Sequence, residues 1–275
     1  MRSISYLLPL LLALAGTVHA AGGPDCSRSY TLALHEHGML YRASNDSGID
    51  RDFATELIRR SGCQVEVSLM PRSRIWKLIE AGALDFSLSG ITNPERDGYA
   101  SFGWYFANKY TLLVRKDTKV KQLSEFEAIP RFKLGVIRSF RYSEVINRFV
   151  DTLAQDDRVI ESVSYDVLYR NLQLNRIQAV IIEPFDYSDM DDYGVRDLVN
   201  VVQTEDQVVP HGLIMSKKRI SAPEADKWRA LIDQMRTDGS LLRIFEKYFS
   251  KDEARSLVYF GEWAKQMPAM AGGDR

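Results

Sequence analysis

The chain has 275 residues, enough for two modest domains or one large one. Charged residues make up 27% of it and hydrophobic residues 45%, which is ordinary for a globular protein. Lysine and arginine (36) nearly balance aspartate and glutamate (37), so the net charge is −1. This balance excludes an overall electrostatic attraction to nucleic acid or to an anionic membrane.

Residues 1–20 have the pattern of a cleaved secretory signal peptide. One arginine precedes an apolar core from Leu7 to Ala15, and Val18 and Ala20 are side chains that signal peptidase accepts. The apolar core is too short to span a bilayer well. We therefore predict cleavage near Ala20 and export of the chain; the alternative is an N-terminal membrane anchor.

The two cysteines, Cys26 and Cys63, would enter an oxidising compartment on export. Each precedes a predicted strand, "YTLALHE" after Cys26 and "QVEVSLM" after Cys63. Two strands that enter one sheet from the same end would bring the thiols close together. We predict a disulfide, with two free buried thiols as the alternative. Two cysteines and scattered histidines do not have the spacing of metal ligands.

The first part of the chain alternates between strand and helix patterns. Short β-rich runs are followed by apolar residues at helical spacing, and Gly62 and Gly82 end the helices. The predicted strands are Tyr30–Glu36, Val65–Met70, Leu84–Ser89 and Lys109–Val114, and the predicted helices are Asp50–Ser61 and Ser73–Ala81.

A second alternating series follows a polar connector near residues 115–120. Its predicted strands are Phe132–Ile137, Arg158–Val163 and Gln178–Glu183, and its predicted helices are Tyr142–Leu153 and Ser164–Asn175. Two β-rich runs and two helices follow, the first of these helices capped by Ser221, and residues 266–275 are predicted to be disordered. The alternation predicts two α/β units with mainly parallel sheets, and a ligand between them at the carboxyl ends of the strands.

The stretch "LSGITNPER" (88–96) predicts an anion site. Thr92 and Glu95 have capping-box spacing directly after a buried strand. A helix start offers unpaired N–H groups, and Arg96 adds a guanidinium suited to a carboxylate. Ser89 and Gly90 are small enough for a ligand to approach the backbone closely. The alternative is that Arg96 makes a surface ion pair and Thr92 only caps the helix.

Three further places are candidates for ligand contact. The turn after the strand "KLGVI" would point the N–H groups of residues 139–142 outward, and Glu183 ends an apolar strand where its carboxylate can accept from a ligand ammonium. His35, Glu36 and Tyr41 follow the first strand and would lie on the rim of a cleft. The alternatives are an ordinary strand-to-helix turn and a glutamate in solvent.

Several motifs resemble those of the periplasmic solute-binding proteins of family 3, the amino-acid-binding family. They are "GIDRDFATEL", "GALD", "TNPER" and "FGWYF", and later "KLGV", "QAVIIEP" and "RTDGSLLRIFEKYF". The likeness implies the two-lobed type II periplasmic binding protein fold, a Venus-flytrap whose chain crosses the hinge twice. Lobe 1 would comprise residues 24–115 and 208–265, and lobe 2 residues 118–205.

The resemblance also implies roles for individual residues. Arg96 would hold the carboxylate of the ligand, helped by Ser89, Thr92 and the helix start near Ser139. Glu183 stands where the family usually has aspartate, and it would hold the ammonium group. No catalytic residue, metal or cofactor is implied.

The sequence departs from the family pattern at the cleft. Bulky Phe140 and Arg141 occupy the turn that usually carries small residues, and Arg72 falls where many members have an aromatic residue. With Arg74, these arginines would make the cleft unusually cationic. An acidic or other anionic solute is therefore as consistent with the sequence as a neutral amino acid.

The resemblance implies a monomeric periplasmic protein that captures a small polar solute, an amino acid or related carboxylate, for the membrane permease of an ABC-type importer. One alternative is an enzyme on the same fold, like the cyclohexadienyl dehydratases, with Glu183 or Glu36 as general acid. No nucleophile–base pair or metal spacing supports that alternative. A third possibility is a sensory partner of a membrane receptor.

Overall fold

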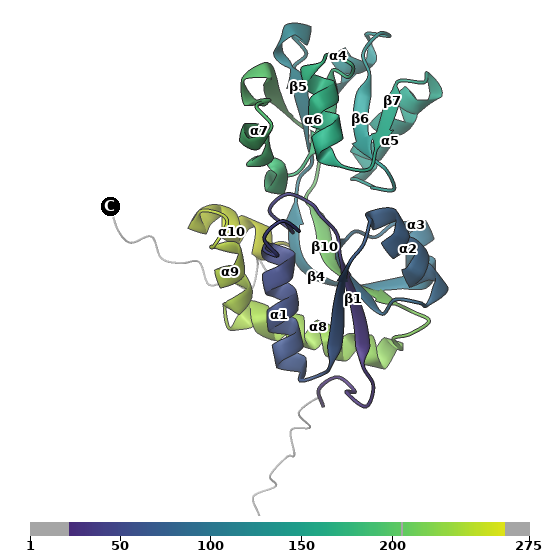
Figure 1. Cartoon of the computed structure of the whole chain (residues 1–275), viewed down its shortest axis with the longest axis vertical. Coiled ribbons are helices and arrows are strands. Elements are labelled where there is room, and N and C mark those ends of the chain that lie inside the picture. The colour runs from purple at the N-terminus through teal and green to yellow at the C-terminus, as the bar shows by residue number, and fades with distance from the viewer. Residues whose placement is uncertain (1–21, 205, 262–275) are drawn as a thin grey trace, which may run out of the picture.

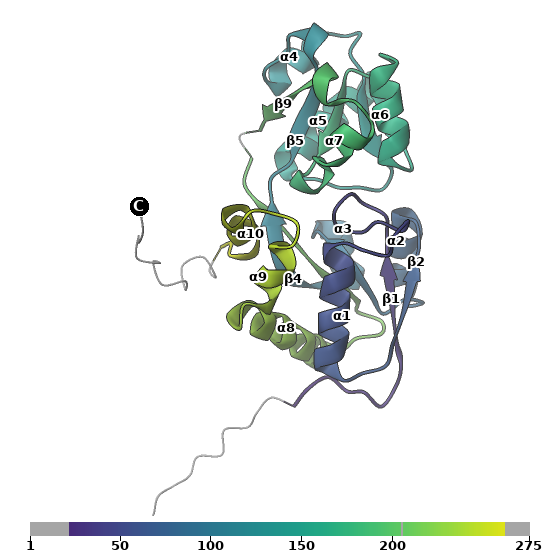
Figure 2. The same cartoon turned by 60° about the vertical axis from the view of Figure 1, so that its left-hand side comes forward.

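The computed structural model describes residues 22–204 and 206–261 and has the predicted two-lobed α/β fold (Figure 1). Each lobe is built on one five-stranded sheet with helices packed against it. Figure 2 shows the lobes stacked along the long axis and joined by extended segments. The predicted signal peptide, residues 1–20, and the predicted tail, residues 266–275, lie outside the described residues.

Lobe 1 has the strand order β2-β1-β3-β10-β4. Its strands are β1 (Tyr30–Leu34), β2 (Val65–Leu69), β3 (Phe86–Gly90), β4 (Ala100–Asn108) and β10 (Val209–Ser216). Its helices are α1 (Ile49–Ser61), α2 (Arg72–Ala81), α3 (Pro94–Tyr99), α8 (Ala222–Thr237), α9 (Ser240–Phe245) and α10 (Lys251–Val258).

Lobe 2 has the strand order β7-β6-β8-β5-β9. Its strands are β5 (Thr111–Arg115), β6 (Leu134–Ile137), β7 (Val159–Ser162), β8 (Ala179–Ile182) and β9 (Val199–Gln203). Its α-helices are α4 (Leu123–Glu127), α5 (Glu144–Gln155), α6 (Tyr165–Gln173) and α7 (Asp189–Asp192), and its 3-10 helices are η1 (Lys116–Thr118), η2 (Pro184–Asp186) and η3 (Arg196–Leu198).

Both sheets are mixed, because each contains one strand that runs against the other four. That strand is β10 in lobe 1 and β5 in lobe 2. Each is the first strand after the chain has crossed from the other lobe, so no crossover helix within the sheet forces it to be parallel. The strands joined by helices, such as β1 and β2, pair in parallel as predicted.

The boundary between the lobes differs from the prediction. The sequence interpretation assigns residues up to 115 to lobe 1, but β5 pairs with β8 and β9 in the sheet of lobe 2. The first crossing therefore lies at Lys109 and Tyr110, and the second joins β9 to β10. A strand that is buried on both faces fits the middle of either sheet, so its sequence does not tell which sheet it joins.

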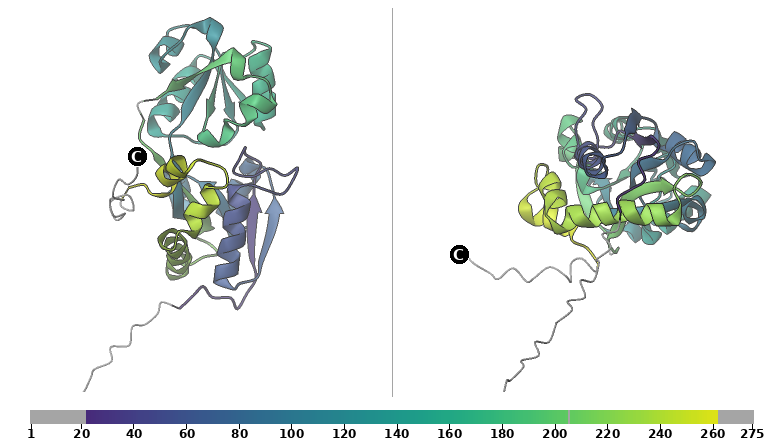
Figure 3. Two further views of the ribbon diagram at one scale, coloured as in Figure 1. Left: turned by 90° about the vertical axis from the view of Figure 1, so that its left-hand side faces the viewer. Right: turned by 90° about the horizontal axis from the view of Figure 1, so that it is seen from below.

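Helices with one apolar face complete the core of lobe 1. Phe53, Ala54 and Leu57 of α1 are buried, and Gly62 ends this helix with a φ of 68°, as predicted. Seen from below in Figure 3, α8 lies across the end of lobe 1 that faces away from lobe 2. No helix in the described ranges is both long and apolar enough to cross a membrane.

The predicted disulfide between Cys26 and Cys63 is confirmed. Their Cα atoms are 4.8 Å apart. Tyr30 at the start of β1 is in register with Val65 at the start of β2, so the residues before these parallel strands meet at one edge of the sheet. The bridge lies at the amino ends of the strands, opposite the end that faces lobe 2.

Candidate functional site

A pocket lies between the lobes, where the carboxyl ends of β1, β3 and β8 meet. Its side chains leave a free volume of about 20 Å³, which is room for about one water molecule. The lining residues are His35, His37, Leu40, Arg72, Ser89, Ile91, Arg96, Tyr110, Phe140, Arg141, Glu183 and His211. Because both lobes contribute, a solute can enter only when the lobes separate.

Arg96 is held between the lobes by its surroundings. Its side chain is buried, and the guanidinium carbon lies 3.9 Å from the centre of the Trp76 ring. Nη1 donates to the carbonyl of Ile91 at 3.2 Å, and Nη2 donates across the gap to the carbonyl of Ser139 at 3.1 Å. Arg96 thus connects lobe 1 to the turn after β6 in lobe 2, where the His37 ring also packs near Phe140.

The start of α3 is capped differently from the prediction. Asn93 is the cap, and its side-chain oxygen accepts from the N–H of Arg96 at 2.8 Å. Thr92 is exposed and donates to Asp97. The predicted capping box of Thr92 and Glu95 is therefore wrong by one residue, because Asn before Pro is itself a strong cap.

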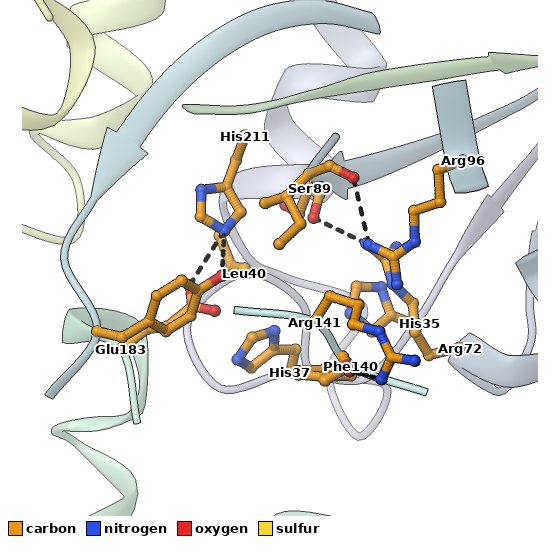
Figure 4. Close-up of a pocket in the computed structure, with 12 residues that line it drawn as sticks. His35, His37, Leu40, Arg72, Ser89, Arg96, Phe140, Arg141, Glu183 and His211 are labelled. Atoms are coloured by element: carbon orange, nitrogen blue, oxygen red, sulfur yellow. Dashed lines mark hydrogen bonds and ion pairs between the residues drawn. The ribbon is translucent and has the colours of Figure 1, made fainter. Parts of the chain in front are cut away.

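Arg72, at the first position of α2, points into the same pocket (Figure 4). Its two Nη atoms donate to the carbonyls of Leu88 and Ser89 at 2.9 and 2.8 Å. Among the described residues, no carboxylate lies within ion-pair distance of Arg72, Arg96 or Arg141. Three cations therefore share one pocket without an acidic partner of their own.

The opposite side of the pocket is acidic. Figure 4 shows Glu183 beside His211, away from the three arginines. Glu183 Oε2 is buried and without a hydrogen bond, 3.7 Å from His211 Nε2. His211 also contacts the hydroxyl of Tyr110, at 3.0 Å. The pocket therefore has a cationic end and an anionic end.

Burial shifts the pKa values of these groups. Burial, and then the nearby cation of Arg72, lower the pKa of Arg96 to about 9. Burial also raises the pKa of Glu183 to about 7, against the effect of His37. Both shifts have the same cause, since a charged group without a partner is unfavourable in a closed cleft. A solute with a carboxylate near Arg96 and an ammonium near Glu183 would supply both partners.

The loop after β1 and the segment after β8 hold the lobes together beside the pocket. Gly38 has a φ of 47°, and a side chain here would clash with the carbonyl of Phe185, so the two backbones can approach only because it is glycine. The contacts across the gap are His37 to Asp186 (3.2 Å), Met39 N–H to the carbonyl of Phe185 (2.9 Å) and Arg42 to Asp189 (2.6 Å).

The pocket contains half of the residues predicted for it. Arg96, Ser89, Arg72, Phe140 and Glu183 line it, and His35 and Arg141 do too. The other five predicted residues do not line the pocket: Gly90 packs against Ile214, and Thr92 and Glu36 are exposed. The hydroxyl of Tyr41 donates to Asp46, and Ser139 contributes only its backbone carbonyl, which accepts from Arg96. Arg74 is also exposed and lies outside the lining.

Sequence interpretation missed His37, Tyr110 and His211. His37 had a signal, because it stands two residues beyond His35 in the same loop. Tyr110 lies on the first segment that joins the lobes, His211 lies near the start of β10 just after the second, and their contact spans 101 positions in the chain. The aromatic residues Tyr105 and Phe106 of β4 belong to the core of lobe 1.

The described residues contain no group of three or more His, Cys, Asp or Glu side chains arranged to hold a metal ion. The polar groups of the pocket instead include three arginines at one end and Glu183 with His37 and His211 at the other. This division suits an organic solute with charges of both signs.

Comparison with known proteins agrees with this fold. The chain belongs to the bacterial extracellular solute-binding proteins, family 3, whose model matches residues 36–251. It is similar to the arginine-binding extracellular protein ArtP of Bacillus subtilis (strain 168), with 22% identity over 215 residues, 76% of this chain and 80% of that protein.

Two solved structures show the same fold. An ancestral arginine-binding protein bound to arginine has a TM-score of 0.70 and 19% identity, over 82% of this chain and 100% of the other. The ancestral amino acid-binding protein AncCDT-1, a precursor of cyclohexadienyl dehydratase, has a TM-score of 0.66 and 21% identity, over 81% and 95%.

Proposed function

We propose that this protein is a periplasmic solute-binding protein that closes around a small carboxylate-bearing solute and delivers it to the permease of an ABC-type importer. The observation that carries the proposal is the set of three arginines, Arg72, Arg96 and Arg141, in an inter-lobe pocket without an acidic partner among the described residues. Arg96 is buried and Arg72 is half-buried, whereas Arg141 is exposed. A buried guanidinium without a carboxylate beside it favours an anionic ligand.

Arg96 is the group best placed to bind the carboxylate. Two of its five N–H donors bond to the carbonyls of Ile91 and Ser139, and the guanidinium offers further donors that can bind an anion. Because one of these carbonyls belongs to lobe 2, binding and closure act on the same side chain. At the other end, the unpaired Glu183 Oε2 is placed to accept from an ammonium group.

The charge of the pocket also bears on the choice of solute. ArtP is named as an arginine-binding protein, but a cationic solute here would add a further positive charge to a pocket that already holds three arginines. Like charges at short range in a closed cleft repel strongly. We therefore propose that the solute is a zwitterionic or acidic amino acid, or a related carboxylate, rather than arginine.

A thermal-shift screen of the exported chain without residues 1–20 tests this function. The screen compares amino acids and small carboxylates, and a bound solute raises the melting temperature by mass action. We expect Arg96→Ala to abolish the shift and Arg74→Ala, an exposed arginine outside the pocket, to retain it. A full shift in Arg96→Ala with the same compound would contradict the assignment of Arg96.

Glu183 favours one alternative, a cyclohexadienyl dehydratase-like enzyme. A carboxyl group whose pKa is raised to about 7 can donate a proton near neutral pH. AncCDT-1 supports this alternative only through its fold. The test is to incubate the protein with a cyclohexadienyl compound and follow the aromatic product by ultraviolet absorbance. Product formation that is lost in Glu183→Gln would favour the enzyme over the binding protein.

A further inference from the structure

A buried polar network lies behind the cationic end of the pocket. Asp50, in the first turn of α1, and Tyr105, on β4, are fully buried, and Ser89, at the end of β3, is nearly so. Ser89 Oγ lies 2.8 Å from both carboxylate oxygens of Asp50, and the Tyr105 hydroxyl donates to Asp50 at 2.6 Å. One carboxylate thus joins a helix and two strands at the edge of the pocket.

This network holds the backbone of Ser89 in an unusual conformation. Ser89 has a φ of 52°, in the left-handed region that non-glycine residues rarely adopt. Its N–H donates to the Tyr105 hydroxyl at 2.9 Å, and its side chain is bound to Asp50. Such a conformation persists only where the surroundings over-determine it, and it is common at binding sites.

The conformation of Ser89 directs its carbonyl toward Arg72. That carbonyl accepts from Arg72 Nη2 at 2.8 Å, and the carbonyl of Leu88 accepts from Nη1 at 2.9 Å. Both contacts come from the strand end that Asp50 supports. Asp50 is also the acidic residue that most favours the charged form of Arg72. Asp50 itself does not line the pocket.

We propose that Asp50 is a positioning residue of the binding site: through Ser89 and Tyr105 it holds the Arg72 guanidinium in the pocket, and it thereby makes the site selective for a solute with a second anionic group. The inference rests on the proposed function, in which Arg96 binds the first carboxylate. Arg72 is then the neighbouring cation available to the second anionic group.

Binding of matched probes tests the proposal. L-aspartate and L-glutamate carry a second carboxylate, and L-asparagine and L-glutamine replace it with an amide of nearly the same shape. We expect the wild-type chain to bind each acid more tightly than its amide in calorimetric titrations. Asp50→Asn should weaken binding of the acids by about tenfold or more and change binding of the amides by less than about twofold.

A double-mutant cycle separates positioning from a general structural role. If Asp50 acts through Arg72, Asp50→Asn should have little further effect on acid binding in an Arg72→Gln background. Tyr105→Phe removes one partner of the network and should shift selectivity in the same direction, so it replaces Asp50→Asn if that variant does not fold. Asp52→Asn is the matched control, because Asp52 pairs with Lys247 and Tyr248.

Each other outcome overturns the inference. The inference is wrong if the wild-type chain binds none of the four probes, or if it binds the amides as tightly as the acids. The inference is also wrong if Asp50→Asn weakens binding of acids and amides equally, or if it weakens binding of the acids just as much in the Arg72→Gln background. Loss of all binding in Arg96→Ala together with equal binding of acids and amides would leave the proposed function standing and reject only the selectivity.

Discussion

At the scale of single residues, the pocket is defined by charges that have lost water without gaining a partner. Arg96 stacks on Trp76 and bonds to backbone carbonyls, which satisfy some donors but do not neutralise the charge. Glu183 has a buried oxygen without a hydrogen bond. Groups in this state favour a ligand of complementary charge, because binding removes a desolvation penalty that already exists in the closed protein.

Trp76 offers a test of how the Arg96 guanidinium is held. Its ring lies 3.9 Å from the guanidinium carbon, and the cation–π contact is worth about 1 kcal/mol in a partly desolvated setting. We expect Trp76→Leu to weaken binding of the solute found in the screen by about fivefold. Isothermal titration calorimetry measures this effect. An unchanged dissociation constant in a folded variant would show that the stacking does not support binding.

His37 predicts how stability depends on pH. Burial alone would lower its pKa, but Asp186, and then Glu183, raise the pKa of His37 to about 9, while Arg72 opposes this. A basic group with a raised folded pKa stabilises the protein below its ordinary pKa of about 6.5, and that contribution is lost as the pH rises toward 9. The free energy of unfolding should therefore fall by roughly 1–3 kcal/mol between pH 6.5 and pH 9.

Urea unfolding at these two pH values measures that fall, with two histidine variants for comparison. We expect His37→Gln to remove most of the slope. His35→Gln should keep it, because burial lowers the pKa of His35 well below its ordinary value and His35 stays neutral throughout this range. A slope that survives in His37→Gln would assign the pH dependence to other groups.

At the scale of elements, the segment after β8 ties lobe 2 to lobe 1. Within η2, Phe185 belongs to lobe 2 by chain order but is fully buried in the core cluster of lobe 1, where it contacts Phe106 and Phe249. Asp186 follows with its ion pair to His37. An apolar anchor and an ion pair on one short helix favour the closed arrangement of the lobes.

Phe185→Ala tests this anchor. Removing the ring should destabilise the closed form by about 3 kcal/mol and shift the ligand-free protein toward open forms. Small-angle X-ray scattering should then show a larger radius of gyration. Phe126→Ala is the control, because Phe126 is equally buried but lies wholly within lobe 2. Equal radii of gyration in the two variants would argue against an anchoring role of Phe185.

At the scale of the whole molecule, stability and binding are placed at opposite ends of lobe 1. The disulfide joins the amino ends of β1 and β2, whereas the pocket lies beyond their carboxyl ends. The parallel strands of the sheet produce this separation. The turns that lead from a strand into a helix lie at the carboxyl edge of the sheet, and these turns carry the polar side chains of the pocket. Changes at one end should therefore leave the other end unaffected.

Replacing both cysteines tests that separation. The bridge spans 37 positions, and closing a loop of this length stabilises a protein by about 3–4 kcal/mol in the chain-entropy model. We expect Cys26→Ser with Cys63→Ser to lower the free energy of unfolding by this amount and to leave the dissociation constant of the solute unchanged at 25 °C. A large loss of affinity in the folded variant would show that the two ends are coupled.

Much of the fold follows from local sequence signals. Apolar residues at helical spacing and the glycines at 62 and 82 give α1 and α2 their extents, and the polar turn residues separate the βαβ units. The disulfide and the place of Arg96 after β3 also follow, since both depend on residues next to a strand end. Each of these features is signalled by residues beside one helix end or strand end, so a short stretch of sequence contains the signal, although the disulfide itself joins positions 37 apart.

Other features were decided only by the tertiary structure. β5 joined lobe 2 through partners about 70 and 90 residues later, and His211 reached Glu183 from β10 in the sheet of lobe 1. Glu36 faced solvent while His35 and His37 faced the pocket, because the loop that contains them packs against lobe 2. Such outcomes depend on pairing between segments that are distant in the sequence. Each segment can pair with several partners of competing energy, so no local sequence pattern indicates which pairing forms.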